Sequence, residues 1–219
     1  MGTNPPTIGI LASEDANARA CAASIERLGG RALRVEADDG AKPDVLLRLI
    51  DALACCDGAG GSGGAIKLVR AALDDDMPIY ALGDGMHLLN AAFGGKSAEV
   101  VAEHSDEDED GGETSAFHHI YIAPGSRLAA VVGSGGFVRV NSRHVEGIRE
   151  AQKSPWLLAS AYSLEDGVIE ALESSRHRWV IGVQFRPERR MELPPHFDRL
   201  FQSLLERAME RMNRAEIRQ

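Results

Sequence analysis

The sequence has few cysteines, no secretion signal and no long apolar run. Cysteine occurs three times in 219 residues, and Cys55 and Cys56 are adjacent within an apolar segment. An odd count with this spacing excludes a disulfide framework and favours a reducing compartment, so we expect a cytoplasmic protein. The N-terminus lacks a basic region followed by an apolar stretch, so we expect no signal peptide. No apolar run approaches the ~20 residues of a transmembrane helix, so we expect no membrane partner.

Positive charge is also in short supply. The chain carries 24 Lys and Arg against 33 Asp and Glu, for a formal net charge of -9. This balance opposes attraction of the whole surface to nucleic acid, and we expect no nucleic-acid partner. Hydrophobic residues make up 44% and charged residues 26% of the sequence, as in ordinary globular proteins. The length suits one domain with a sizeable core.

Strand-like and helix-like segments alternate in the first half of the chain. Apolar runs predict strands at 7–11, 32–35, 53–56 and 79–82. Between them, apolar residues at helical spacing predict helices at 15–28, 43–50 and 66–73. This alternation predicts a parallel sheet covered by helices on both faces.

The second half of the chain begins with an acidic, glycine-bearing segment. We interpret residues 104–114 as an acidic flexible loop, and His104, His118 and His119 beside it as part of a solvated surface. Short apolar runs then predict strands in hairpins, at 119–122, 128–132, 137–140, 158–161, 168–172 and 179–185. An amphipathic helix follows. We therefore divide the chain into an N-terminal tail (1–6), one domain (7–213) and a C-terminal tail (214–219).

The segment PIYALGDGMHLLNAAFGG, residues 78–95, is typical of a strand, a sharp turn and a helix. Such a turn presents a residue above the carboxyl edge of a sheet, where acyl-transfer enzymes hold a nucleophile. Backbone N–H groups at the start of the helix face any anion placed there. Here the turn is Gly83-Asp84-Gly85, which contains no Ser or Cys nucleophile.

This segment resembles P-[IV]-L-G-I-C-R-G-M-Q-L-L-N-x-x-x-G-G of the class I glutamine amidotransferase-like superfamily. The most similar branch is the γ-glutamyl-γ-aminobutyrate hydrolases, or peptidase C26. Further segments that resemble this branch follow in the same order: IAPGSRLAAVVG, VNSRHVEGIRE, DGVIEALE and GVQFRPE. The resemblance implies a three-layer, flavodoxin-like α/β fold, in which antiparallel hairpins are added to a mostly parallel sheet, and no cofactor.

The resemblance also places the family's Cys–His–Glu triad on this chain. The cysteine falls on Gly83, the histidine on Arg186 and the glutamate on Glu188. Glycine offers no nucleophile, and an arginine stays protonated and cannot be a general base. We therefore expect a catalytically degenerate member that binds a small-molecule ligand or a protein partner, with a homodimer left open. The alternative is an active hydrolase of γ-glutamyl or related amides with rebuilt chemistry.

Five residues are the candidate ligand-binding set: Asp84, His87, His144, Arg186 and Glu188. We expect Arg186 to form an ion pair with Glu188, with Asp84 or with both. In the alternative, Asp84, His87, His144 and Glu188 hold a metal or orient a water, although their spacing carries no local ligand signature and we predict no metal site.

Two further features have a structural interpretation at this stage. Cys56 could line the same cleft as a substitute nucleophile, but we favour a buried structural thiol. The glycine-rich segment 57–64 lacks the residues of a phosphate-binding loop, and we expect a turn beside the former oxyanion hole. Glycine at position 83 also relieves the backbone strain that this kind of turn imposes on other residues.

Overall fold

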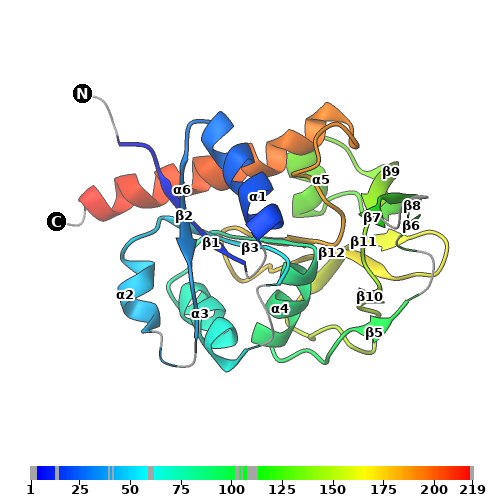
Figure 1. Cartoon of the computed structure of the whole chain (residues 1–219), viewed down its shortest axis with the longest axis horizontal. Coiled ribbons are helices and arrows are strands. Elements are labelled where there is room, and N and C mark those ends of the chain that lie inside the picture. Colours follow the sequence, from blue (N-terminus) through cyan, green and yellow to red (C-terminus); the bar gives the residue numbers. More distant parts are fainter. Residues whose placement is uncertain are drawn as a thin grey trace.

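The computed structural model describes residues 4–12, 15–38, 40, 42–58, 62–101, 104, 106–107 and 113–217. Within them, a nine-stranded sheet runs through the molecule in the order β2-β1-β3-β4-β13-β12-β11-β8-β9 (Figure 1). The first five strands in this order pair in parallel. They are β1 (Thr7–Leu11), β2 (Arg31–Val35), β3 (Ala52–Cys55), β4 (Ile79–Leu82) and β13 (Val180–Val183).

The other half of the sheet is antiparallel. It contains β8 (Ala116–Ile122), β9 (Gly136–Ser142), β11 (Leu158–Ser163) and β12 (Ile169–Glu173). Two short ribbons lie outside this sheet: β5 (Glu99–Val100) with β10 (Glu146–Gly147), and β6 (Asp106–Glu107) with β7 (Glu113–Thr114).

Helices cover both faces of the sheet (Figure 1). Residues of α1 (Asp15–Arg27), α5 (Arg127–Val132) and α6 (Arg199–Ile217) share one apolar cluster with the sheet. Residues of α2 (Pro43–Leu47), α3 (Gly63–Asp74) and α4 (Asp84–Ala92) share a second cluster on the opposite face. A single turn, η1 (Pro195–Asp198), leads into α6. The predicted three-layer α/β fold is confirmed.

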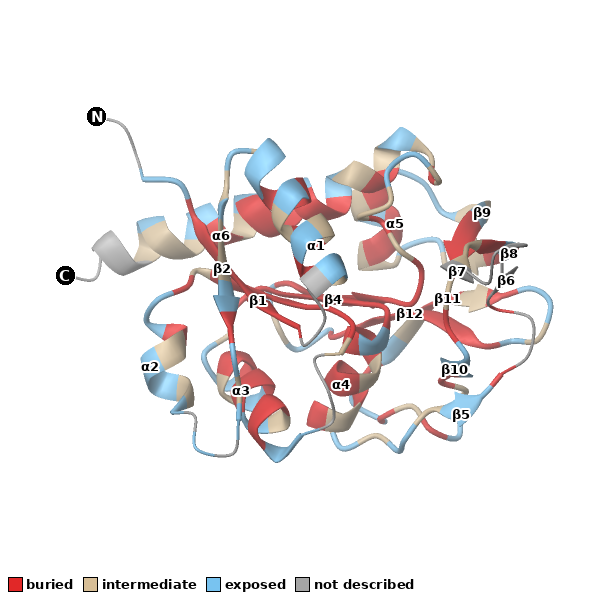
Figure 2. Ribbon diagram, viewed as in Figure 1, coloured by how far each residue is buried: buried red, intermediate tan, exposed pale blue. Residues whose placement is uncertain are grey.

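Side-chain alternation along the strands builds these two clusters. Ala54 and Tyr80 point into the α1–α6 cluster, whereas Leu53 and Ile79 point into the α3–α4 cluster. The central strands β1, β3, β4, β12 and β13 are therefore buried on both faces (Figure 2). Full burial of a side chain such as Leu53 or Ile79 contributes about 1.5–3 kcal/mol, so the sheet forms a rigid support for the loops at its carboxyl edge.

One strand prediction about the second half is wrong. Residues 128–132 are not a strand, because α5 begins where Ser126 Oγ accepts a hydrogen bond from Ala129 N (3.0 Å) and ends at Gly133 in the left-handed conformation. These caps select a helix for an apolar run whose length also suits a strand. The predicted strand at 179–185 is present as β13, which forms a hairpin with β12 and also pairs in parallel with β4.

The segment 104–114 contains the two strands β6 and β7. His104 is buried with an exposed fraction of 3%. The rest of the predicted flexible loop, residues 105 and 108–112, lies outside the described residues. At the other end, α6 continues past residue 213 to Ile217. No helix among the described residues is long and apolar enough to span a bilayer.

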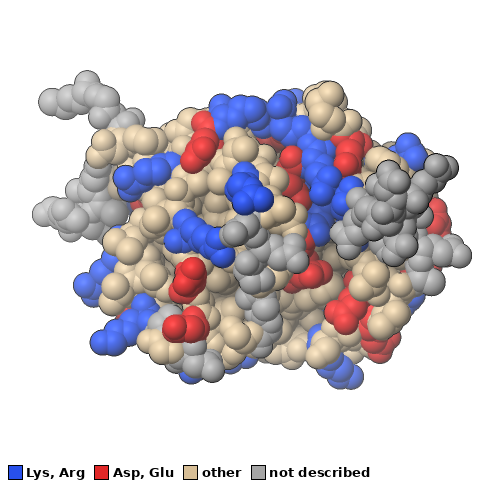
Figure 3. Space-filling model, in the orientation of Figure 1, with Lys and Arg blue, Asp and Glu red and all other residues tan. Residues whose placement is uncertain are grey.

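Charged side chains of both signs cover the face seen in Figure 3, and Lys and Arg gather along its upper edge. Arg27 at the end of α1 and Arg190 before η1 both pair with Asp198, at 3.0 Å. The surface thus has local groups of basic side chains although the net charge of the chain is negative. That the chain binds no nucleic acid stays a prediction.

Candidate functional site

The turn between β4 and α4 places Gly83 at the carboxyl edge of the parallel strands. Its backbone has φ +54° and ψ -125°, a conformation that residues with a Cβ rarely adopt. Gly83 N donates to Val183 O at 2.9 Å, which fixes the turn on β13. Gly85 packs so closely on Cys55 that a Cβ would overlap the Cys55 carbonyl oxygen. Together the two glycines hold the elbow against the ends of β3 and β13.

Asp57, two residues beyond the end of β3, occupies the space above the elbow. A Cβ built on Gly83 would overlap Asp57 Oδ1. The same oxygen accepts a hydrogen bond from Asp84 N at 2.8 Å, while Asn17 Nδ2 donates to Asp57 Oδ2 at 3.0 Å. In a nucleophile elbow, the N–H of the residue after the nucleophile helps to bind the oxyanion. Here the chain's own carboxylate takes that N–H.

Arg186 joins the carboxylates of Asp57 and Glu188. Its guanidinium forms an ion pair with Asp57 Oδ2 and lies 3.4 Å from Glu188 Oε1. The Arg186 side chain is 11% exposed and that of Glu188 is 4% exposed. Asn141 holds the Arg186 backbone on both sides, because it donates to Arg186 O (3.1 Å) and accepts from Arg186 N (2.9 Å).

Burial and ion pairing act against each other in this network. Burial raises the pKa of Glu188, and the neighbouring Arg186 guanidinium opposes that rise. Burial lowers the pKa of Arg186, and Glu188 opposes that fall. A buried charge keeps its ionised form only with such partners, so each member of the Asp57–Arg186–Glu188 network depends on the others. The predicted pair of Arg186 with Glu188 is confirmed.

Asp84 and His87 lie on the first turn of α4, apart from this network. The predicted pair of Arg186 with Asp84 is wrong, because the Asp84 carboxylate is 59% exposed and lies 3.8 Å from His87 Nδ1. His87 Nε2 lies 2.8 Å from Gln184 Oε1 on the residue after β13. Burial lowers the pKa of His87, which Asp84 and Gln184 partly offset.

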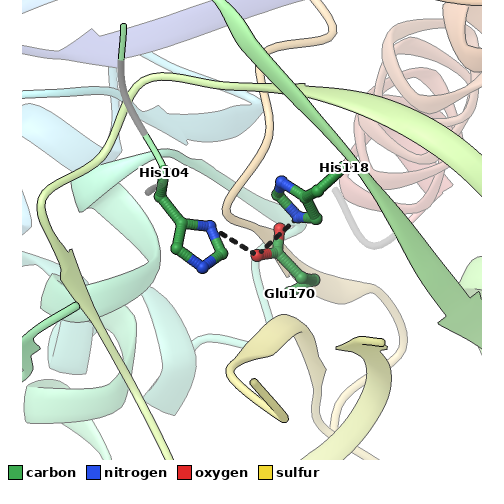
Figure 4. A group of neighbouring side chains, drawn as sticks. All are labelled: His104, His118 and Glu170. Atoms are coloured by element: carbon green, nitrogen blue, oxygen red, sulfur yellow. Dashed lines mark ion pairs between the residues drawn. The ribbon is translucent and has the colours of Figure 1, made fainter. Parts of the chain in front are cut away.

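His144 belongs to a second group of buried side chains, at the antiparallel half of the sheet, where β8 and β12 supply two of its members. His104, His118, His144 and Glu170 have exposed fractions of 0–5%. Glu170 Oε1 lies 3.1 Å from His118 Nε2, 3.5 Å from His144 Nε2 and 3.9 Å from His104 Nδ1. Figure 4 shows two of these rings pointing at the carboxylate. The prediction that His104 and His118 are solvated is wrong, while His119 on the other face of β8 is exposed.

The four residues proposed as metal ligands therefore divide among three places. Glu188 pairs with Arg186, His87 contacts Gln184, and His144 faces Glu170. Among the described residues, the only group with three ligand atoms within 4.8 Å of one another is His104, His118 and Glu170.

The two vicinal thiols, Cys55 and Cys56, are held in their protonated form by their buried surroundings. Cys55 and Cys56 are buried, with exposed fractions of 0% and 3%. Burial raises the pKa of Cys55 to about 12. A hydrogen bond with Cys21, together with burial, raises the pKa of Cys56. Since the thiolate is the reactive form, the geometry agrees with a structural role for Cys56.

A cavity of about 820 Å³ lies at the opposite edge of the sheet. Its lining includes Asp51, Asp76 and Arg178, which precede β3, β4 and β13 at their amino ends. No residue of the predicted site lines this cavity. Ligands of open α/β sheets bind at the carboxyl edge, so the elbow remains the candidate site.

Comparison with known proteins decides the family. The sequence model of the family Peptidase C26 matches residues 63–188, more than half of the 219-residue chain. The chain belongs to the peptidase C26 family. One similar protein is gamma-glutamyl-gamma-aminobutyrate hydrolase PuuD of Escherichia coli strain K12, which is 30% identical over 132 residues, 57% of this chain and 51% of PuuD. The chain spans about half the length of the curated relatives it matches.

Solved structures agree with the fold of this C26 family chain. A crystal structure of a Thermoplasma acidophilum protein matches with a TM-score of 0.71 and 16% identity, covering 98% of this chain and 100% of that one. The glutaminase domain of Trypanosoma brucei CTPS with bound acivicin matches with a TM-score of 0.67 and 16% identity, covering 94% of each chain. At this identity the likeness shows the fold alone.

Sequence reasoning missed two central residues of this C26 family chain. Asp57 follows β3, the strand next to the elbow strand, and side chains at neighbouring carboxyl ends meet. The position of Asp57 directly after this strand could have indicated that its side chain lies at the elbow. Glu170 is a charged residue inside the apolar strand β12, and burial of a carboxylate requires partners. Its partners come from distant segments, which the local sequence does not reveal.

Proposed function

We propose that this C26 family chain is a catalytically inactive member that works by binding a ligand or a protein partner. The observation that carries the proposal is the position of Asp57. Its carboxylate fills the volume in which a nucleophilic side chain on residue 83 would lie, and it accepts the Asp84 N–H. Both the nucleophile and an oxyanion donor of acyl transfer are therefore lost at one point.

The general base is also lacking in this proposal. Arg186 stands at the position that the family resemblance gives to the catalytic histidine, and a guanidinium has no lone pair to accept a proton. Its two carboxylate partners, Asp57 and Glu188, hold it in place. The elbow therefore supports a stable ionic network in place of a proton relay.

The same network favours recognition at the surface around the elbow. A carboxylate or carbonyl group entering the elbow has to displace Asp57 from Arg186 and from Asp84 N. The Asp84 side chain, by contrast, is 59% exposed on the first turn of α4. We therefore expect a partner to contact this rim and to leave the Asp57–Arg186–Glu188 network intact.

Hydrolysis assays with γ-glutamyl-γ-aminobutyrate and glutamine test the proposal, with E. coli PuuD as the positive control. We expect the wild-type chain to match the rate without enzyme. The double variant Gly83→Cys/Arg186→His should remain inactive, because Asp57 still overlaps the introduced thiol. Adding Asp57→Gly removes that overlap.

Turnover by the wild-type chain would overturn the proposal. Loss of that turnover in Arg186→Ala would assign the chemistry to the elbow. Loss of turnover on chelation, with Arg186→Ala unaffected, would assign it to a metal.

A further inference from the structure

The buried group of His104, His118, His144 and Glu170 has no role in the elbow. It joins four segments of the chain: His104 two residues before β6, strand β8, the segment between β9 and β10, and strand β12. Glu170 has an exposed fraction of 0%. Both of its carboxylate oxygens, and both ring nitrogens of His118, lack a hydrogen-bond partner of acceptable geometry.

The outer contacts of two rings fix which nitrogen faces Glu170. His144 Nδ1 lies 2.8 Å from the backbone carbonyl oxygen of Glu146, which can only accept, so Nδ1 carries the hydrogen. In the neutral ring, Nε2 then turns a lone pair toward Glu170 Oε1 at 3.5 Å. His104 Nε2 lies 3.4 Å from Asp166 Oδ2. His104 Nδ1 lies 3.5 Å from Ser142 Oγ, which donates to the His104 carbonyl oxygen, and 3.9 Å from Glu170 Oε1.

Lone pairs that face a carboxylate repel it unless a cation lies between them. One proton can satisfy one of the three ring-to-Glu170 contacts. Three protonated rings would place like charges with ring centroids only 4.4–6.5 Å apart, in a buried site. A single divalent metal ion satisfies all the contacts at once, since it accepts the lone pairs and the carboxylate together.

We propose that His104, His118 and Glu170, with His144 as a fourth ligand, form a site for a divalent transition metal of the zinc type. The three ligand atoms of the first set lie within 4.8 Å of one another. Bonds of about 2.1 Å in a tetrahedron give ligand-to-ligand distances of about 3.4 Å. The observed 3.1, 3.5 and 3.9 Å from Glu170 Oε1 bracket that distance.

Two of the histidine rings also have the outer hydrogen-bond partners that are typical of metal-bound histidines. A carboxylate on His104 and a backbone carbonyl on His144 are the usual partners that fix a ligand ring and its tautomer. All four side chains are at least nine-tenths buried. The site therefore joins β8 and β12 to the segments that hold His104 and His144, and it binds its metal as the chain folds. This assignment departs from the sequence-based expectation of no metal.

The test uses the full chain and Zn²⁺ as the probe. Metal content is measured after purification without added metal, and after unfolding in chelator and refolding with or without Zn²⁺. We expect one metal ion per refolded chain, a higher melting temperature with Zn²⁺, and tetrahedral Co²⁺ absorption on substitution. None of these readouts depends on enzymatic activity, so they stand apart from the test of the elbow.

Variants assign the ion to this group. Glu170→Gln should abolish binding. Asp166→Asn alters the outer contact of His104, together with the Asp166 contacts to Arg149 and Val168 N, and should weaken binding by about 10- to 100-fold. His119→Gln is the matched control, because His119 lies on the same strand but is exposed. Absence of metal in both refolded and purified wild-type protein would overturn the proposal. Metal binding that Glu170→Gln leaves unchanged would also overturn it.

Discussion

Substitution of Gly83 by alanine measures how completely Asp57 fills the elbow. The backbone at φ +54° and ψ -125° penalises any Cβ, at a cost of about 1–3 kcal/mol. The new methyl group would also displace Asp57 Oδ1, which accepts from Asp84 N. Loss of one hydrogen bond to a charged group adds about 1.5–3 kcal/mol. We therefore expect Gly83→Ala to lower the free energy of unfolding by about 2.5–6 kcal/mol.

Urea unfolding of matched variants separates the two contributions. Gly94 has φ +80°, and a Cβ there would have no heavy atom within 4 Å. Gly94→Ala should therefore cost only the backbone penalty, about 1–2 kcal/mol. A double-mutant cycle of Gly83→Ala with Asp57→Ala should show a coupling of about 1.5–3 kcal/mol, because the second change removes the overlap.

Equal destabilisation by Gly83→Ala and Gly94→Ala would refute this reasoning. It would mean that Asp57 leaves the elbow without cost, so that the volume above residue 83 is open to a ligand. A cycle with no coupling would lead to the same conclusion.

Two further predictions concern buried and half-buried ionisable groups. A thiol reagent should label Cys55 and Cys56 only after unfolding, since burial raises the pKa of Cys55 to about 12; rapid labelling of the native protein at neutral pH would contradict this and reopen the case for a reactive Cys56. Burial raises the pKa of Glu192, but hydrogen bonds from Ser115 and Asn141 outweigh it and lower the pKa below the ordinary 4.5. The stabilisation by the carboxylate is present above pH 4.5 and is lost as the pH falls through the lowered value. Glu192→Gln should therefore reduce stability at neutral pH, and a urea midpoint difference from wild type that persists in strong acid would argue against this cause.

The parallel half of the fold could be predicted because its signals are local. The apolar runs of β1, β3 and β4 are each bounded by turn residues, and burial on both faces makes such runs continuous. The elbow could be predicted for the same reason, since strand, glycine turn and helix follow one another without interruption. Each of these features depends on neighbours within about ten residues.

The predictions were wrong where a contact with a distant residue or a helix cap determines the local structure. The run at 128–132 suits a strand or a helix by composition, and the caps at Ser126 and Gly133 select the helix. His104 and His118 stand beside an acidic segment, yet they turn inward because Glu170 lies behind them on β12. A pairing across more than fifty residues has no trace in either local sequence.

The residues at the elbow hold one another in place. Gly83 leaves the volume that the Asp57 carboxylate fills, and Asp57 in turn forms an ion pair with the buried Arg186. Glu188 is the second carboxylate partner of Arg186. Removing one partner from a buried ion pair costs about 3–5 kcal/mol, so changing Arg186 alone leaves two carboxylates buried side by side. A side chain on residue 83 cannot enter until Asp57 leaves, and Asp57 cannot leave without weakening the hold on Arg186. Each single change in this network is therefore destabilising, and only a combined change opens the elbow.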